Sequence, residues 1–137
     1  MRLKVSSASR GNKDRLPEGT YLVEIWRVYT KSQDGSDLID KSGNPYFSVI
    51  FRGISDEVAG KTHWQNFFTE GNFAGRTMQL LKASGVVSMD AAENIDFNPE
   101  LLTQRVVGIE LVQNSKGYIN VESVMTEDQF NSLDIPF

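Results

Sequence analysis

The feature that most limits the possible folds is a single segment with helical spacing, set among segments that resemble β-strands. Its apolar and small residues fall three, four and seven positions apart and so share one helix face: Phe73, Thr77, Leu80, Leu81 and Ser84. Asn72 is expected to cap its start, Lys82 suits its last turn, and Gly85 suits the position after its end. A chain with one such helix is expected to be mostly β.

Five segments have the alternation, or the density of β-branched and aromatic residues, that is typical of strands. They cover residues 20–30, 46–54, 61–69, 105–113 and 118–124. In the second segment Phe47, Val49 and Phe51 share one face, so Tyr46 and Arg52 should point to the opposite face. Between the strands, a short helical turn is expected at 99–104 and a hairpin turn at 114–117.

Three strands, one helix and two more strands predict an all-β fold with one helix, the five-stranded OB-fold barrel, in which the helix lies between strands three and four. An OB-fold binds single-stranded nucleic acid or oligosaccharides on strands two and three and the flanking loops. We expect the domain to cover residues 16–125, after a flexible basic arm of residues 1–15 and before an acidic tail of residues 126–137. The polar segment 31–45 is expected to be a long mobile loop.

Composition excludes several classes of protein. The chain has no cysteine, which rules out disulfides, thiolate nucleophiles and cysteine metal sites and favours a cytoplasmic location. No apolar run is long enough to span a membrane, so no membrane partner is expected. The polar N-terminal residues lack the apolar region of a secretory signal.

Charge is unevenly distributed along the chain. The net charge of −4 is unusual for a protein that binds nucleic acid, but no Lys or Arg follows residue 121. The first 121 residues are neutral, with 14 basic and 14 acidic residues, and the first 15 residues are basic. Two solvated ends would explain this pattern, and so would a basic arm for phosphates with an acidic tail that stays away from DNA.

Aromatic and basic residues are interleaved in the predicted strands. Bases of single-stranded nucleic acid stack on aromatic rings for about 1–3 kcal/mol each while cations follow the phosphates, with little preference for sequence. The candidate site residues are Trp26, Tyr29, Lys31, Tyr46, Arg52, Lys61, Trp64, Phe68, Lys116 and Tyr118. About half of the rings are expected to belong to the core instead. The faces of Trp26 and Trp64 stay open, because a β-bulge in either strand would reverse them.

Neither catalysis nor a metal or cofactor is expected. His63 is the only histidine and has no carboxylate at an informative spacing, so a surface or groove position is the simpler interpretation. The alternative is a small hydrolase or nuclease in which the acids Asp90, Glu93 and Asp96 hold a metal ion. Solvated loop acids are the default interpretation of such residues.

Several segments resemble a phage family of small OB-fold proteins. The similar segments are LPEGTY at 16–21, FSV at 47–49, AGK at 59–61, Phe67, QLLK at 79–82 and NPELL at 98–102. Members of that family lie among replication and recombination genes and behave as single-stranded DNA-binding proteins. The resemblance covers residues 16 to about 124 and implies a phage protein that protects single-stranded DNA.

The last four residues resemble the end of the tail in bacterial single-stranded DNA-binding proteins: Asp134, Ile135, Pro136 and Phe137. In that family the tip recruits replication and repair enzymes, so the resemblance implies the same kind of partner here. Pro136 restricts its own φ and favours extended backbone at Ile135, so the tip would lose little entropy on binding. Unlike bacterial tails, this one is only about a dozen residues long, and Ser132 and Leu133 stand where those tails have more Asp.

Two interpretations of function therefore remain. The first is a sequence-tolerant single-stranded DNA-binding protein of phage replication and recombination, which recruits partner enzymes through its tip. The second is a protein–protein adaptor of the replication machinery without strong DNA binding. The sequence leaves association into a homo-oligomer open.

Overall fold

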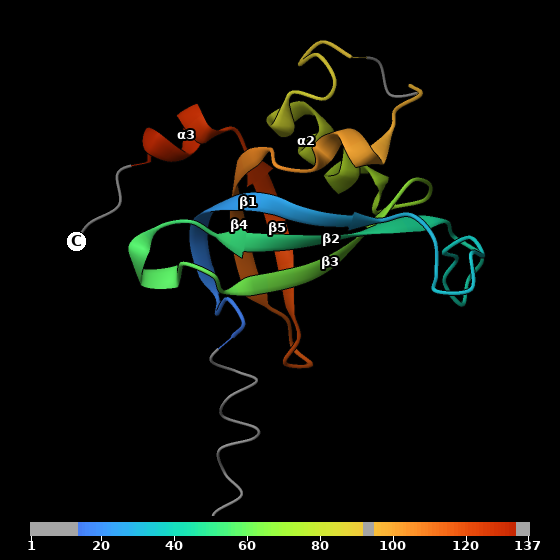
Figure 1. The fold of residues 1–137 in the computed structure, drawn as a ribbon, viewed down its shortest axis with the longest axis horizontal. Helices are drawn as coiled ribbons and strands as arrows, with labels where there is room; N and C mark the ends of the chain where they lie inside the picture. Colours follow the sequence, from blue (N-terminus) through green and yellow to red (C-terminus); the bar gives the residue numbers. More distant parts are fainter. Residues whose placement is uncertain (1–13, 92–94, 134–137) are drawn as a thin grey trace, which may run out of the picture.

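The structure is a computed structural model that describes residues 14–91 and 95–133. It is mostly β: five antiparallel strands form one curled sheet with a single long helix packed against it (Figure 1). The strands are β1 (Gly19–Tyr29), β2 (Tyr46–Gly53), β3 (Thr62–Phe68), β4 (Val106–Gln113) and β5 (Ile119–Met125). Their order across the sheet is β3-β2-β1-β4-β5, which makes β3 and β5 the two edges.

The curl of the sheet centres on β1, which pairs with two strands. Residues 19–24 pair with β4 and residues 23–29 pair with β2. The register of the second pairing shifts between Ile25 and Arg27, so Trp26 is the extra residue of a β-bulge. A bulge bends its strand and increases the local twist. Accordingly, β1, β2 and β3 run across β4 and β5 in Figure 1.

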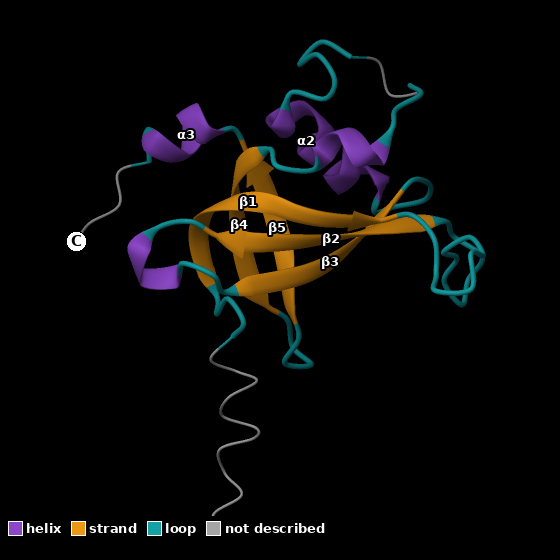
Figure 2. Cartoon of the chain, viewed as in Figure 1, coloured by secondary structure: helices purple, strands orange, loops and turns teal. Residues whose placement is uncertain are grey.

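The hydrophobic core lies on the inner face of the sheet. The alternation predicted for β2 and β4 is confirmed, because the expected inner residues are all buried: Phe47, Val49, Phe51, Val107, Ile109 and Leu111. Helix α2 (Ala74–Ser84) covers one end of this core and contributes Leu80 and Leu81. Figure 2 shows α2 at the upper end of the sheet, on the side away from the β4–β5 hairpin.

Helix α2 ends as predicted. Four of the five residues expected on its inner face are buried: Thr77, Leu80, Leu81 and Ser84. The fifth, Phe73, is exposed. Gly85 adopts a left-handed φ of 83° and its N–H donates to the carbonyls of Leu81 and Lys82, which terminates the helix.

The start of α2 was predicted wrongly. Phe73 rather than Asn72 holds the N-cap position, without a side-chain cap. The reason is a turn in which Gly71 has a φ of 83° and its carbonyl accepts from the Ala74 N–H, so helical geometry begins one residue later. Phe73 consequently lies outside the buried helix face, and 65% of it is exposed.

The segment between β1 and β2 is more structured than the expected mobile loop. It contains isolated bridges between Lys31 and Asp37 and between Ile39 and Pro45. Within it, the Asp40 carboxylate accepts hydrogen bonds from the backbone N–H groups of Ser42 and Asn44. Residues 31–45 therefore form two hydrogen-bonded turns.

The segment after β5 begins with a short helix rather than an extended tail. Helix α3 (Glu127–Asn131) starts with a capping box, in which Thr126 Oγ1 accepts from the Gln129 N–H and Gln129 Oε1 accepts from the Thr126 N–H. Phe130 of α3 packs over Gly108 of β4, where an added Cβ would lie only 3.0 Å from the Phe130 Cβ. The tail is thus docked on β4 before the described residues end.

The remaining local predictions concern short segments. A 3₁₀ turn, η2 (Pro99–Leu102), confirms the helical turn expected at 99–104, and Asn114 and Gly117 close the expected hairpin turn. Of the expected basic arm, only residues 14 and 15 are described, and Arg15 forms a parallel bridge with Thr62. None of the helices in residues 14–91 and 95–133 is long and apolar enough to cross a membrane.

Candidate nucleic-acid interface

The outer face of β1, β2 and β3 brings together most of the predicted aromatic residues. The bulge decides the side of Trp26: Ile25 and Val28 both pack on the core, so Trp26 and Arg27 both point outward. Strand β3 is regular and buries Phe67 on its inner face. Trp64 and Phe68, three residues before and one residue after Phe67, therefore point to the outer face. Six predicted site residues share this face: Trp26, Tyr29, Tyr46, Arg52, Trp64 and Phe68.

Tyr29 and Trp64 form an exposed stack at the centre of the outer face. Their ring centroids are 5.5 Å apart and their planes differ by 14°. Tyr29 is 40% exposed and Trp64 58% exposed. The two residues come from β1 and β3, on either side of β2. Tyr29 pairs with Ser48 of β2 and Trp64 pairs with Ile50, so the sheet brings the two rings together across β2. Such rings offer flat apolar surfaces on which a planar base can stack.

Trp26 has a different role from this stacked pair. The guanidinium groups of Arg27 and Arg52 lie 4.6 and 5.0 Å from the centroid of its ring, within the range of cation–π attraction. Arg52 also donates from Nη2 to Glu24 Oε1 at 2.6 Å, whereas Arg27 has no carboxylate within 4.0 Å among the described residues. Trp26 therefore holds two cations on the outer face, and of these Arg52 is paired with a carboxylate whereas Arg27 has no such partner among the described residues.

A groove of about 910 Å³ borders this surface. One side is formed by Trp26, Trp64 and Arg15, and the other by Tyr118 and Asn120 from the β4–β5 hairpin. Tyr118 is 67% exposed, and its ring belongs to the predicted set. The volume falls within the usual range for ligand sites, and the lining combines rings with a cation.

His63 lies at the inner side of this groove, next to the open edge of β3. Its Nε2 is 2.8 Å from Gln65 Oε1, and burial lowers its pKa, with a further contribution from the charge of Arg15. The neutral imidazole is therefore favoured at neutral pH. Gln65 Oε1 also accepts from the Val121 N–H at 3.0 Å, which joins the two edge strands through a side chain.

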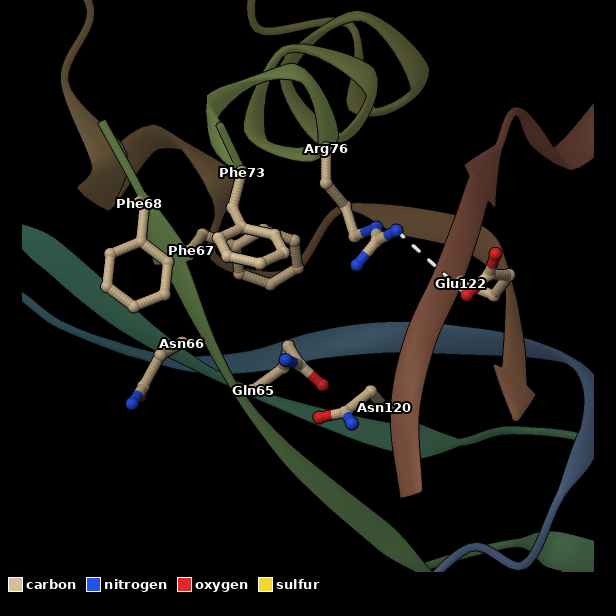
Figure 3. A pocket seen from close by; sticks show the side chains of 8 residues that line it. All are labelled: Gln65, Asn66, Phe67, Phe68, Phe73, Arg76, Asn120 and Glu122. Atoms are coloured by element: carbon tan, nitrogen blue, oxygen red, sulfur yellow. Dashed lines mark ion pairs between the residues drawn. The ribbon is translucent and has the colours of Figure 1, made fainter. Parts of the chain in front are cut away.

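A second hollow, of about 390 Å³, lies between β3, the start of α2 and β5 (Figure 3). Phe68 and Phe73 form its apolar wall, while Arg76 and Glu122 face each other with Nη2 and Oε2 4.0 Å apart. Asn120 lines both this hollow and the groove. The two cavities therefore adjoin along the edge of β3.

The predicted lysines lie outside both cavities. Lys31 forms an ion pair with Asp37 in the loop before β2, Lys61 precedes β3, and Lys116 is in the β4–β5 hairpin. None of the three lines the groove or the hollow.

Several lining residues were missed by sequence reasoning. Ile50 was predictable, because the alternation of β2 places it beside Tyr46 and Arg52. Arg15 was expected only as part of the basic arm, and Asn120 gave no local signal. A bridge to Thr62 and the pairing of β4 with β5 bring these two residues to the groove. Phe73 was placed on the shared face of the predicted helix, but the helix begins one residue later and leaves this ring exposed.

Two groups of predicted residues are not placed by the structure. Glu93 lies in the undescribed segment 92–94, between Asp90 and Asp96. Within the described part of the chain, no three His, Cys, Asp or Glu side chains are grouped so that they could hold a metal ion. The tip formed by Asp134, Ile135, Pro136 and Phe137 lies outside the described residues.

Comparison with protein families and with curated proteins gives no match. No protein-family model matches the chain, and no curated protein is detectably similar to it. The function therefore has to be argued from the geometry of the outer face.

Proposed function

We propose that this protein binds single-stranded DNA, with little dependence on sequence, on the outer face of β1, β2 and β3. The observation that carries the proposal is the exposed stack of Tyr29 on Trp64, beside Arg27, which has no ion-pair partner in the part of the chain that the structure describes. Bases stack on such rings for about 1–3 kcal/mol each, and a neighbouring guanidinium neutralises phosphate. Stacking does not distinguish one base from another, which is why sequence should matter little.

We further propose that the curled sheet is an OB-fold barrel with α2 as the helix between its third and fourth strands. Three facts support this: the element order, the pairing of β1 with both β2 and β4, and the β4–β5 hairpin beside β3. The hydrogen bond from the Val121 N–H to Gln65 spans the gap between the edge strands. Oligonucleotides bind OB-folds on strands two and three and the loop between strands four and five, where the groove lies.

The net charge of −4 does not oppose this function, because local charge governs phosphate binding. Arg15 lines the groove and Arg27 lies on the adjoining face. Of the acids on this face, Glu24 is already paired with Arg52. At about 0.15 M salt, exposed charges more than about 8 Å away are largely screened.

The direct test is a titration of labelled oligo-dT, followed by fluorescence anisotropy, at salt concentrations from about 50 to about 200 mM. Binding should be detectable at low salt and should weaken as salt increases, and a duplex of the same length should bind much more weakly. An absence of oligo-dT binding at low salt would contradict the proposal and favour the adaptor interpretation.

We propose that the tip formed by Asp134, Ile135, Pro136 and Phe137 recruits replication or recombination enzymes. Helix α3, which precedes the tip, packs on β4 and β1 rather than on β2 and β3 among the residues that the structure describes. The protein should capture such enzymes, and deleting Phe137 should abolish this capture. Its affinity for oligo-dT should be unchanged or slightly higher, and undiminished capture would contradict this role.

A further inference from the structure

The hollow beside the groove has an aromatic wall that the core does not use (Figure 3). The centroids of the Phe68 and Phe73 rings are 6.2 Å apart, with the planes tilted by 43°. Phe73 is exposed, whereas Leu80 and Leu81 of the helix that follows it are buried. An aromatic ring in this position is free to stack on a ligand.

The opposite side of the hollow presents hydrogen-bonding groups with unused capacity. Arg76 and Glu122 point toward each other, but at 4.0 Å their nearest atoms are too far apart for a hydrogen bond. The Asn120 side chain makes no hydrogen bond to any described residue. A cation, a carboxylate and an amide are therefore available next to the aromatic wall.

This combination matches the polar edge of guanine. Guanine carries the acceptors O6 and N7, which an Arg can bind in bidentate fashion, and it has donors at N1 and N2 next to O6. A carboxylate can accept two parallel hydrogen bonds, so Glu122 can take the N1–H and N2–H donors while Arg76 donates to O6. Adenine and cytosine each carry one amino group and thymine one ring N–H, so each leaves part of the site unmatched.

We propose that this hollow holds one guanine base of the bound strand, stacked on Phe73 and read by Arg76 and Glu122. The inference rests on the proposed single-stranded DNA binding. Because Asn120 lines both cavities, a strand that lies on Tyr29 and Trp64 reaches the hollow without leaving the surface. The groove is thus tolerant of sequence, while one position adjoining it favours guanine.

The test compares oligo-dT with an oligonucleotide of the same length in which isolated guanines interrupt the thymines, spaced so that no two are adjacent. The guanine-containing strand should bind about fivefold more tightly or better, as expected for one well-made bidentate contact. Replacing guanine by hypoxanthine, which lacks the N2 amino group, should reduce this preference. Equal affinity of the wild-type protein for the two strands would overturn the inference.

Glu122→Gln is the informative variant. It keeps the side-chain shape but removes the charge, so the ratio of its affinities for the guanine-containing strand and for oligo-dT should fall to about one. The control is Glu100→Gln on η2, an exposed acid away from both cavities, which should keep the preference. A persisting preference in Glu122→Gln would also overturn the inference. If the guanine preference fails either test but the wild type still binds oligo-dT, the inference is wrong and the proposed function stands. If the wild type does not bind oligo-dT at all, both the inference and the proposed function are wrong.

Discussion

Arg27 and Arg52 flank the same tryptophan but differ in what they can offer a phosphate. Arg52 is held by Glu24 at 2.6 Å, whereas Arg27 has no such partner among the described residues. Glu24 therefore reduces the positive charge of the outer face. An unbound cation on this surface would release one more counterion when DNA binds.

Glu24→Gln should accordingly bind oligo-dT more tightly. We expect a gain of about two- to fivefold at low salt, and a plot of log affinity against log salt that is steeper by about 0.7 for one additional phosphate contact on a single strand. Anisotropy titrations at several salt concentrations measure both quantities, with Glu100→Gln as the control for loss of a distant acid. An unchanged slope would mean that Arg52 does not face the strand.

His63 makes the stability of the protein depend on pH. Its pKa in the folded state is lowered, chiefly by burial, below the value of about 6.5 expected in the unfolded chain. The unfolded state therefore binds more protons in this range, and stability is lost as pH falls from about 6.5 through the lower folded pKa. Asp34, with a pKa lowered to about 2 by hydrogen bonds from Ser32 and Ser36, loses its contribution only below about pH 4.

The thermal melting temperature of the wild type should thus fall between about pH 7 and pH 5. His63→Gln removes the titrating group and should show a smaller fall over the same interval. Differential scanning fluorimetry in matched buffers measures the difference. Parallel pH profiles for the two proteins would show that the imidazole does not contribute.

Among the elements, the strands were predictable and the irregularities were not. Alternation in β2 and β4 identified the buried residues because one inner face alone contacts the core. The bulge at Trp26 depends on the pairing of β1 with β2, which no local pattern encodes, so the sequence left the face of Trp26 open. The capping box at Thr126 and Gln129 is a local signal that could have predicted α3.

The docking of α3 depends on the absence of a side chain at Gly108. A Cβ there would come within 2.7 Å of Met125 Cγ and 3.0 Å of Phe130 Cβ. Gly108→Ala should therefore displace α3 and lower the free energy of unfolding by about 1–3 kcal/mol, as overpacking does. Urea unfolding gives the stability, and hydrogen exchange at residues 127–131 reports the release of the helix.

The matched control is Gly75→Ala in α2, where a Cβ would meet no atom within 4 Å. Because alanine favours the helical backbone, this variant should be as stable as the wild type or more stable by up to about 1 kcal/mol. The account of α3 would be wrong if Gly108→Ala behaved like Gly75→Ala in both measurements.

Over the whole molecule, the curled sheet separates the exposed aromatic residues from helix α3. The exposed rings of Tyr29 and Trp64 lie on the outer face of β1, β2 and β3. Helix α3, at the other side of the sheet in Figure 1, packs on β4 and β1. The even balance of charge in the first 121 residues conceals this arrangement, because only the fold brings Arg15 and Arg27 to one side. The sequence therefore predicted which kinds of residue are exposed on this face better than where they lie on it.

The central claim is that unpaired bases stack on Tyr29 and Trp64, and it is tested most directly by removing those rings. The affinity for oligo-dT at low salt should be compared in the wild type, Tyr29→Ala, Trp64→Ala and Leu101→Ala, the last of which removes an exposed apolar side chain on η2. Each aromatic variant should stay folded and bind about tenfold more weakly, while Leu101→Ala should bind like the wild type. Wild-type affinity in a folded Trp64→Ala protein would contradict the claim.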